Sequence, residues 1–249
     1  VIDQSRYERG SGSVVGFSGC RNVKVEGVIL CDASMWCCTF FGCDSVEVDN
    51  VKIVGQWRYN SDGIDVVNSS RVRVRNCFVR SFDDALVVKG MKRNLGEPEP
   101  IDIGHLPVED VLFENCTVWC DWGHALEIGA ETCAPSIRNV VYRGIDIVRT
   151  SFVAMSILHG DGALVRDILY EDIRLNIDPH TPSPVFQTSR GEVYEDAGGF
   201  VPMLFEAIIN KDMLWAQDAL ASDVEGVIYR NISVTGPEPG SSSNSMPIR

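Results

Sequence analysis

A nine-residue pattern recurs seven times along the chain and limits the possible folds more than any other feature. Each copy has two short stretches of alternating apolar and polar residues, separated by Asn, Gly or Asp, which tolerate a left-handed turn. The copies lie at residues 22–30, 45–53, 71–79, 110–118, 139–147, 167–175 and 226–234. The repeat therefore describes one structural unit used again and again.

The spacing of the copies indicates a solenoid. The first Val or Ile of each copy falls at positions 23, 46, 72, 111, 140, 168 and 227, so the steps are 23, 26, 39, 29, 28 and 59 residues. A period in the twenties with occasional insertions is typical of solenoids. Alternation with a period of two, and no helical pattern between copies, predicts an all-β fold, a single-stranded parallel β-helix of about seven coils. A sandwich or propeller would need hairpin or blade motifs, which the sequence lacks.

Two long segments interrupt the coils. Residues 91–107 predict a loop at one edge, and residues 176–222 predict a partly helical insertion whose helix begins at Pro202 and runs through Ala216. The insertion could serve as a lid, an end cap or an interface. We expect one β-helix domain over residues 1–235 and a flexible Gly- and Ser-rich tail over 236–249. The insertion and the first coil, which no polar cap precedes, are both possible surfaces for a homo-oligomer.

Composition excludes several classes of partner. The net charge of −13 argues against binding nucleic acid or an anionic membrane surface, and no apolar run is long enough to span a membrane. The nine cysteines include no CxxC pair and do not fit a zinc site. Buried free thiols, together with the lack of a visible signal peptide, favour a cytoplasmic location for the sequence given, although it does not begin with Met. Neither a cofactor nor a metal site is predicted.

Charged residues fall at equivalent positions when the strands that follow the pattern copies are aligned with one another. Asp62, Asp84 and His124 then stand above one another at the strand starts, with Asp83 in the preceding turn. The next outward column is predicted to hold Asp65, Val87, Glu127 and Ser156. Coils of a β-helix lie about 4.8 Å apart, so adjacent carboxylates repel unless one of them is protonated. This condition separates carboxyl groups into an acid and a base.

These motifs resemble the polygalacturonase family of glycoside hydrolases, family 28, in the pectin-lyase-like superfamily. The family pattern is NTD, DD and GHG on successive coils of a right-handed parallel β-helix, and the matching segments here are residues 60–62, 83–84 and 123–124. Residues 33–36 also resemble its SPxW turn, and the resemblance covers about residues 12–175. The dextranase family of the same clan shares the three aspartates.

The resemblance implies inverting hydrolysis of a plant or microbial polysaccharide or oligosaccharide. In that mechanism Asp83 is the general acid, Asp62 and Asp84 hold and deprotonate the water, and His124 orients or tunes the acid. Further candidates for contacts with the carbohydrate are Lys89, Glu127, Asn60, Trp122, His159 and Asp161.

Two departures from the family pattern point to a changed substrate. The family's Arg-x-Lys, which grips the uronate carboxylate, falls at Ser156 and Leu158, neither of which can bind an anion in that way. Glu127 adds an acid beside the site. Both departures favour a neutral or differently decorated sugar over galacturonan.

Other interpretations remain open at this point. Asp62 before Gly63, and the pair at residues 83–84, are also residues typical of turns. A polysaccharide lyase of similar shape would bind Ca²⁺ at the acidic cluster, but no arginine is placed for β-elimination. A non-catalytic β-helical module for carbohydrate binding or assembly is the alternative outside enzymes.

Overall fold

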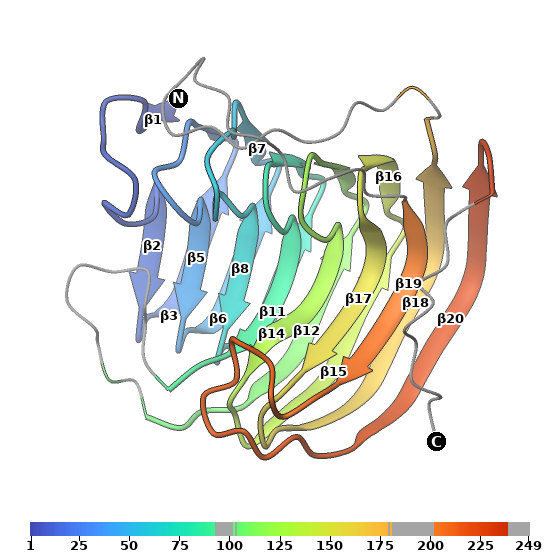
Figure 1. Cartoon of the computed structure of the whole chain (residues 1–249). Helices are drawn as coiled ribbons and strands as arrows, with labels where there is room; N and C mark the ends of the chain where they lie inside the picture. Colours follow the sequence, from blue (N-terminus) through green and yellow to red (C-terminus); the bar gives the residue numbers. More distant parts are fainter. Residues whose placement is uncertain (93–101, 103, 179, 181–201, 239–249) are drawn as a thin grey trace.

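The computed structural model describes residues 1–92, 102, 104–178, 180 and 202–238, and within them the chain winds as a right-handed parallel β-helix (Figure 1). Every strand pairing in it is parallel, and each strand pairs with its equivalent one coil further along the chain. The predicted right-handed parallel β-helix is therefore confirmed, apart from its partly helical insertion.

One face of the solenoid is a seven-stranded sheet, which we call the site sheet. Its strands, in spatial order, are β2 (Val15–Ser18), β5 (Cys38–Phe41), β8 (Ile64–Val67), β11 (Leu86–Gly90), β14 (Leu126–Thr132), β17 (Val153–His159) and β19 (Met203–Ile209).

The other two faces form one 13-stranded sheet. One row holds β3 (Arg21–Glu26), β6 (Asp44–Asp49), β9 (Ser70–Arg75), β12 (Val108–Glu114), β15 (Ser136–Arg143), β18 (Leu164–Asn176) and β20 (Val224–Thr235). The second row holds β1 (Ile2–Asp3), β4 (Ile29–Cys31), β7 (Lys52–Val54), β10 (Phe78–Ser81), β13 (Thr117–Cys120) and β16 (Asp146–Thr150). The long strand β18 joins the rows because it pairs with both β15 and β16.

The repeated pattern folds this way because the Asn, Gly and Asp residues between its short strands lie at the corners of the coil. The sixth position of every copy has a positive φ, at Gly27, Asn50, Asn76, Asn115, Gly144, Asp172 and Asn231. The first position does too, at Asn22, Ser45, Arg71, Asp110, Asn139, Asp167 and Gly226. Gly, Asn and Asp adopt this backbone conformation at least cost, so the pattern sets where each coil bends.

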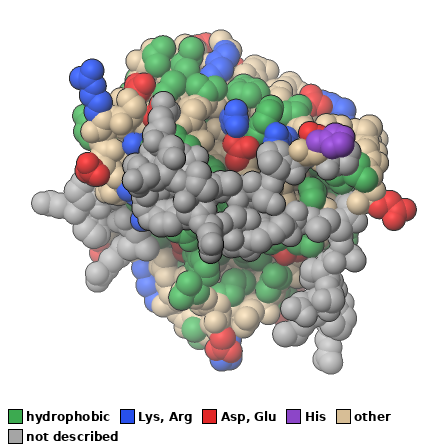
Figure 2. Space-filling view, turned by 45° about the horizontal axis from the view of Figure 1, so that its top comes forward, with side chains coloured by type: hydrophobic (Ala, Val, Ile, Leu, Met, Phe, Trp, Pro, Cys, Tyr) green, Lys and Arg blue, Asp and Glu red, His purple; other side chains and the backbone are tan. Residues whose placement is uncertain are grey.

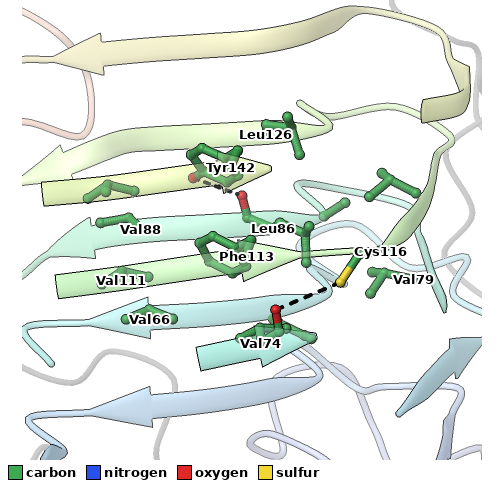
Figure 3. Packing of buried hydrophobic residues seen from close by; sticks show 14 of the residues in the cluster. Val66, Val74, Val79, Leu86, Val88, Val111, Phe113, Cys116, Leu126 and Tyr142 are labelled. Atoms are coloured by element: carbon green, nitrogen blue, oxygen red, sulfur yellow. Dashed lines mark hydrogen bonds between the residues drawn. The ribbon is translucent and has the colours of Figure 1, made fainter. Parts of the chain in front are cut away.

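Stacked side chains fill the interior. Phe113, Tyr142, Tyr170 and Tyr229 stack on successive coils, with ring centroids 4.8, 5.0 and 5.0 Å apart. Figure 3 shows the Phe113 and Tyr142 rings among the valines and leucines of the neighbouring strands. Cys116 lies in the same core and stacks above Cys77, as the repeat predicted, and both thiols are free. Most of the nine cysteines are buried and none forms a disulfide.

The prediction of a helix from Pro202 to Ala216 is wrong. Residues 203–209 form β19, which pairs with β17 in register, with Met155 opposite Phe205 and Ser156 opposite Glu206. The open edge of β17 offers a full row of backbone partners, and this tertiary pairing outweighs a local helical pattern. A proline directly before the strand is compatible with it.

Ion pairs between neighbouring coils cover the outer faces. Arg143 on β15, for example, lies 2.8 Å from Glu171 on β18, which Arg230 on β20 also contacts at 2.8 Å. Figure 2 shows Lys and Arg side chains interspersed with Asp and Glu on the face in view, outside the undescribed atoms. No helix long and apolar enough to cross a membrane occurs among the described residues.

The predicted domain limits stay predictions. Parts of the 91–107 loop, of the 176–222 insertion and of the tail after 236 lie outside the described residues. The homo-oligomer predicted through the insertion or the first coil is likewise untested.

Candidate active site

Three polar side chains stand above one another beside successive strands of the site sheet. Asp62, Asp84 and His124 each lie two residues before the start of β8, β11 and β14. These strands pair in the register that the repeat predicts, and the backbone N–H of Ala85 donates to the carbonyl of His124 at 2.9 Å. The structure therefore brings these residues of adjacent coils together at one edge.

They open into a cavity of about 340 Å³. Its polar lining consists of Asn60, Asp62, Asp83, Asp84, Lys89, His124, Glu127, Glu131 and Glu206. Its large apolar lining consists of Trp36, Tyr59, Trp122, Phe152, Leu158, Ile208, Met213, Leu214 and Trp215. A concave site of this size with converging polar groups is typical of a small-molecule binding pocket.

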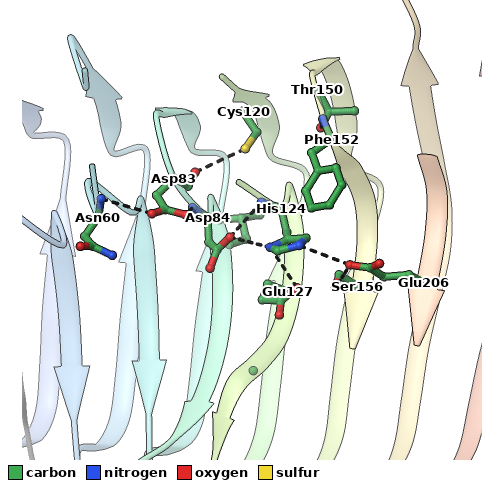
Figure 4. Close-up of polar contacts among 12 residues, drawn as sticks. Asn60, Asp83, Asp84, Cys120, His124, Glu127, Thr150, Phe152, Ser156 and Glu206 are labelled. Atoms are coloured by element: carbon green, nitrogen blue, oxygen red, sulfur yellow. Dashed lines mark hydrogen bonds and ion pairs between the residues drawn. The ribbon is translucent and has the colours of Figure 1, made fainter. Parts of the chain in front are cut away.

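Backbone amides hold the Asp83 carboxyl group in place. Its Oδ2 accepts from Asn60 N at 3.2 Å and its Oδ1 from Asp84 N at 3.1 Å (Figure 4). Gly123 of the next coil approaches so closely that a Cβ there would lie 2.6 Å from Asp83 Oδ1. A side chain at position 123 would displace this carboxyl, so the coil needs glycine next to His124.

The two adjacent carboxyls differ in their affinity for a proton. Burial, followed by the negative charge of Asp84, raises the pKa of Asp83 to about 7. Burial alone would also raise the pKa of Asp84, but the charge and hydrogen bonds of His124, followed by the charge of Lys89, lower it to about 2. At neutral pH Asp84 is therefore an anion, whereas Asp83 can carry a proton.

His124 is the cation that stabilises the Asp84 anion. Its backbone N and its Nδ1 both lie 2.8 Å from Asp84 Oδ1, and Nδ1 lies 3.6 Å from Glu127 Oε2. Its Nε2 lies 3.3 Å from Glu206 Oε1. Burial lowers the pKa of His124, but Glu127, Asp84 and Glu206 together raise it well above the usual value. The imidazole is therefore positively charged at neutral pH.

Two further carboxyls of the cluster, Asp62 and Glu127, bind a proton more tightly than usual. Burial, followed by the charge of Asp65, raises the pKa of Asp62 well above its usual value. Burial raises the pKa of Glu127 to about 8, against the opposing effect of His124. Lys89 stays charged, because Glu131 at 3.1 Å and Asp84 at 3.7 Å raise its pKa despite burial. Asp84 is thus the ionised carboxylate among the three predicted catalytic aspartates.

Glu206 was missed by the sequence analysis. It comes from β19, lies in register with Ser156, and accepts a hydrogen bond from the Ser156 hydroxyl at 3.2 Å. The signal was present, because residues 203–209 can be aligned with residues 153–159 as one further coil of the site sheet. Because the sequence predicted a helix here, Glu206 was not placed in the outward column that holds Glu127 and Ser156.

We expect Glu206→Gln to lower the pKa of His124, because it removes one of the negative charges that stabilise the imidazolium. The chain has four histidines, so their imidazole signals can be titrated and assigned by NMR. Glu225→Gln, an exposed position on β20, is the matched control and should leave the His124 titration unchanged. An unchanged or raised His124 pKa in Glu206→Gln would contradict the pairing.

Four of the six predicted carbohydrate contacts line the cavity: Asn60, Lys89, Glu127 and Trp122. The Trp122 ring stacks on Phe82, with centroids 6.1 Å apart, and is tilted against Tyr59 at 5.3 Å. Arg9 donates to the Asn60 side chain from the N-terminal segment. Trp122 and Tyr59 thus form an aromatic wall of the cavity, from the coils after and before Asp83.

The other two, His159 and Asp161, do not line the cavity. Both are fully buried. Asp161 Oδ1 accepts from the backbone N–H groups of Gln217 and Asp218 at 2.5 and 2.8 Å, and His159 Nδ1 is 2.9 Å from the Thr132 hydroxyl. The Asp161 carboxylate therefore holds the segment after β19 against the end of β17, whereas the His159 ring contacts β14. Neither residue belongs to the proposed site. Among the described residues, no group of three or more His, Cys, Asp or Glu side chains is arranged to hold a metal ion.

The comparisons with known proteins agree on one family. The family model described as Glycosyl hydrolases family 28 matches residues 5–181. Polygalacturonase QRT2 of Arabidopsis thaliana is 23% identical over 241 residues, which is 92% of this chain and 45% of that protein. A probable polygalacturonase of the same plant is 28% identical over 115 residues, 40% of this chain and 25% of that protein. This chain spans less than half the length of either relative.

Solved structures share the fold. An exopolygalacturonase from Thermotoga maritima superimposes with a TM-score of 0.54 at 22% identity, over 90% of this chain and 55% of that one. A polygalacturonase from Erwinia carotovora ssp. carotovora gives a TM-score of 0.60 at 17% identity, over 94% of this chain and 57% of that one. At these identities the likeness extends to the β-helix alone.

Proposed function

Because the chain belongs to glycosyl hydrolases family 28, whose model matches residues 5–181, we propose that it is an inverting glycoside hydrolase with Asp83 as the general acid. Asp84 and Asp62 hold the attacking water, and Asp84 takes its proton. His124 keeps Asp84 ionised. The substrate is a carbohydrate without a uronate at the position next to His124.

The observation that carries this proposal is the opposite pKa shift of two neighbouring carboxyls. Asp83, with a pKa of about 7, can donate a proton near neutral pH, whereas Asp84, with a pKa of about 2, stays ionised. Paired titratable groups whose environments separate their pKa values are the mark of acid and base roles. Purely structural turn residues would not need a buried cation such as His124 between coils.

The reaction follows from these charges. The oxygen of water attacks the anomeric carbon as the bond from that carbon to the glycosidic oxygen breaks. Asp83 gives its proton to the departing oxygen, and Asp84 accepts the proton that the water loses. The two carboxyls exchange protonation states, and one proton transfer through solvent restores them. Attack from the face opposite the leaving group inverts the anomeric configuration.

The proposed exclusion of uronate is supported by two positions on β17. Ser156 and Leu158, next to the strand that follows His124, carry no positive charge, and Glu206 lies beside Ser156. A uronate carboxylate there would meet a carboxylate and lose its water without a cation to replace it.

We expect the enzyme to release an inverted anomer from a neutral glycan and to lose activity above neutral pH. The assay is NMR of the first product formed from a panel of polygalacturonate, rhamnogalacturonan, galactan and α-glucans. Because Asp83 acts in its protonated form and has a pKa of about 7, kcat/KM should fall about tenfold for each pH unit above 7. The acid limb, set by Asp84, should lie near pH 2.

Four outcomes would contradict the proposal. A retained anomer would exclude single displacement. Rapid hydrolysis of polygalacturonate would contradict the exclusion of uronates. Binding without turnover across the whole panel would move the chain to the non-catalytic binding modules, and an unsaturated product would move it to the lyases.

A further inference from the structure

A second cavity, which we call the outer cavity, adjoins the catalytic one. Its volume is about 670 Å³. Four residues line both cavities: Tyr59, Glu131, Leu214 and Trp215. The outer cavity is also lined by Lys92, Ala216 and Gln217. The proposed reaction gives none of these residues a role, so the outer cavity needs a separate explanation.

One wall of the outer cavity is linked to the proposed base. Lys89 Nζ is 3.7 Å from Asp84 Oδ2 and 3.1 Å from Glu131 Oε2. A single ammonium group therefore separates Asp84 from Glu131, which belongs to the lining of both cavities. The two cavities are continuous at this wall.

Tyr59 links the outer cavity to the proposed acid in a similar way. The backbone N–H of Asn60, the next residue, donates to Asp83 Oδ2 at 3.2 Å. Arg9 holds Tyr59 from the N-terminal segment, because its Nε donates to the Tyr59 carbonyl at 3.3 Å and its guanidinium lies 5.1 Å from the ring centroid. A glycan that is cleaved between Asp83 and Asp84 therefore has a neighbouring unit next to the outer cavity.

Trp215 supplies a second ring from the opposite side of the site sheet. Tyr59 precedes β8, whereas Trp215 follows β19, so the two residues come from opposite ends of the parallel strands. Trp215 is 46% exposed and its neighbour Leu214 is 85% exposed. Large apolar groups exposed beside a polar cavity are a common mark of ligand contact. A pyranose ring has an apolar C–H face that can pack on an indole ring.

The loop that carries Trp215 is held in place before a ligand arrives. Residues 210–222 leave β19 and turn back across the end of β17 (Figure 1). The Asp161 carboxylate accepts the N–H groups of two loop residues at 2.5 and 2.8 Å. The backbone N–H of Lys92, just after β11, donates to Gln217 Oε1 at 2.9 Å. The loop is therefore fixed both to the end of β17 and to the end of β11.

The polar groups of the outer cavity suit an uncharged ligand that is rich in hydroxyl groups. They comprise one carboxylate, one ammonium group and one amide, from Glu131, Lys92 and Gln217. The bond from Lys92 orients the Gln217 amide, whose Nε2 can donate to a hydroxyl, and the Glu131 carboxylate can accept from one. A few convergent polar groups beside aromatic side chains are typical of sites for small organic ligands.

We propose that the outer cavity is a subsite for a further sugar unit of the substrate, which packs on the Trp215 ring. The substrate is then an oligosaccharide or polysaccharide, and not a disaccharide or simple glycoside. The inference rests on the proposed glycosidase function and narrows its substrate class. Binding energy from a unit away from the broken bond can be used to lower the barrier as well as to hold the substrate.

The test measures kcat/KM against the length of the substrate. The substrates are galacto-, malto- and rhamnogalacturono-oligosaccharides of two, four and six units, with the products separated by chromatography. In the series that the enzyme accepts, kcat/KM should rise about 10–100-fold once a unit reaches the outer cavity, and then level off.

Trp215→Ala should reduce this rise to about threefold or less, whereas Trp215→Phe keeps an aromatic ring and should retain most of it. Leu220→Ala is the matched control, because Leu220 lies in the same loop, is 69% exposed and is outside the described lining of both cavities. Its dependence on chain length should equal that of the unmodified protein. Since Trp215 is nearly half exposed, Trp215→Ala should unfold at the same temperature as the unmodified protein.

A flat dependence on chain length, or a rise that Trp215→Ala leaves intact, would overturn the subsite but leave the glycosidase proposal standing. Failure to hydrolyse any of the three series would count against the glycosidase proposal itself. Calorimetric binding of the same oligosaccharides would then decide the subsite separately. Tighter binding of six units than of two, lost in Trp215→Ala, would support it, whereas equal affinities or no binding would overturn it.

Discussion

Asp83→Asn should lower kcat/KM by about 10²–10⁴-fold on a glycoside with an unactivated leaving group, the usual effect of removing a general acid. Asp83 is the one cavity carboxyl that combines a pKa of about 7 with an ionised neighbour of pKa about 2. An amide cannot give up a proton to the departing oxygen, so the barrier to bond cleavage rises while the binding surface keeps its shape.

The role of Asp83 can be separated from that of Asp84 by the leaving group. A 2,4-dinitrophenyl glycoside departs without protonation, so Asp83→Asn should lose much less activity on it than on the natural linkage. Asp84→Asn should lose activity on both, because the water still needs a base. Equal losses for the two variants on both substrates would contradict the assigned roles.

The effect of Asp83→Asn on stability has to be measured separately from its effect on activity. Both Asp83 oxygens accept backbone N–H groups, at 3.2 and 3.1 Å, and an asparagine can accept only one of the two. Thermal unfolding of Asp83→Asn should therefore show a modest loss of stability. Asp167→Asn, the same substitution at a side chain that is 63% exposed, should change neither activity nor stability.

The coils and the alignment of the catalytic candidates could be predicted because both depend on local chemistry. Corner residues such as Asn50, Asn76 and Asn115 take positive φ values that few residue types allow, so they mark each bend in the sequence. Once the bends are known, the period of two fixes which side chains point outward. Asp62, Asp84 and His124 then align without further information.

Glu206 and the true position of Asp161 could not be predicted in this way. A long segment separates the pattern copy at residues 167–175 from β19, so the copy does not mark where this strand begins. The pairing of β19 with β17 is a contact between segments 50 residues apart in the case of Ser156 and Glu206. Asp161 looks like a polar residue of a Gly-rich turn until the loop that it anchors is known. The pKa of Asp83 likewise depends on burial by several coils at once.

The same stacking that aligns the site makes its core sensitive to one substitution. Tyr142 is fully buried between Phe113 and Tyr170, nearly parallel to both rings. Its hydroxyl donates to the carbonyl of Glu127 at 2.9 Å, directly under the site sheet. Tyr142→Ala removes a ring from the middle of a continuous stack, and the β-sheet backbone on both sides limits how far the neighbours can close the gap.

We expect Tyr142→Ala to lower the free energy of unfolding by about 3–5 kcal/mol, the range for truncating a large buried aromatic side chain. Tyr142→Phe keeps the stack and removes only the hydroxyl, so it should cost about 0.5–1.5 kcal/mol. Urea unfolding followed by tryptophan fluorescence and by circular dichroism measures both variants and tests whether the coils unfold together. A loss in Tyr142→Ala no larger than that in Tyr142→Phe would show that the hydroxyl, and not the stacked ring, stabilises this part of the solenoid.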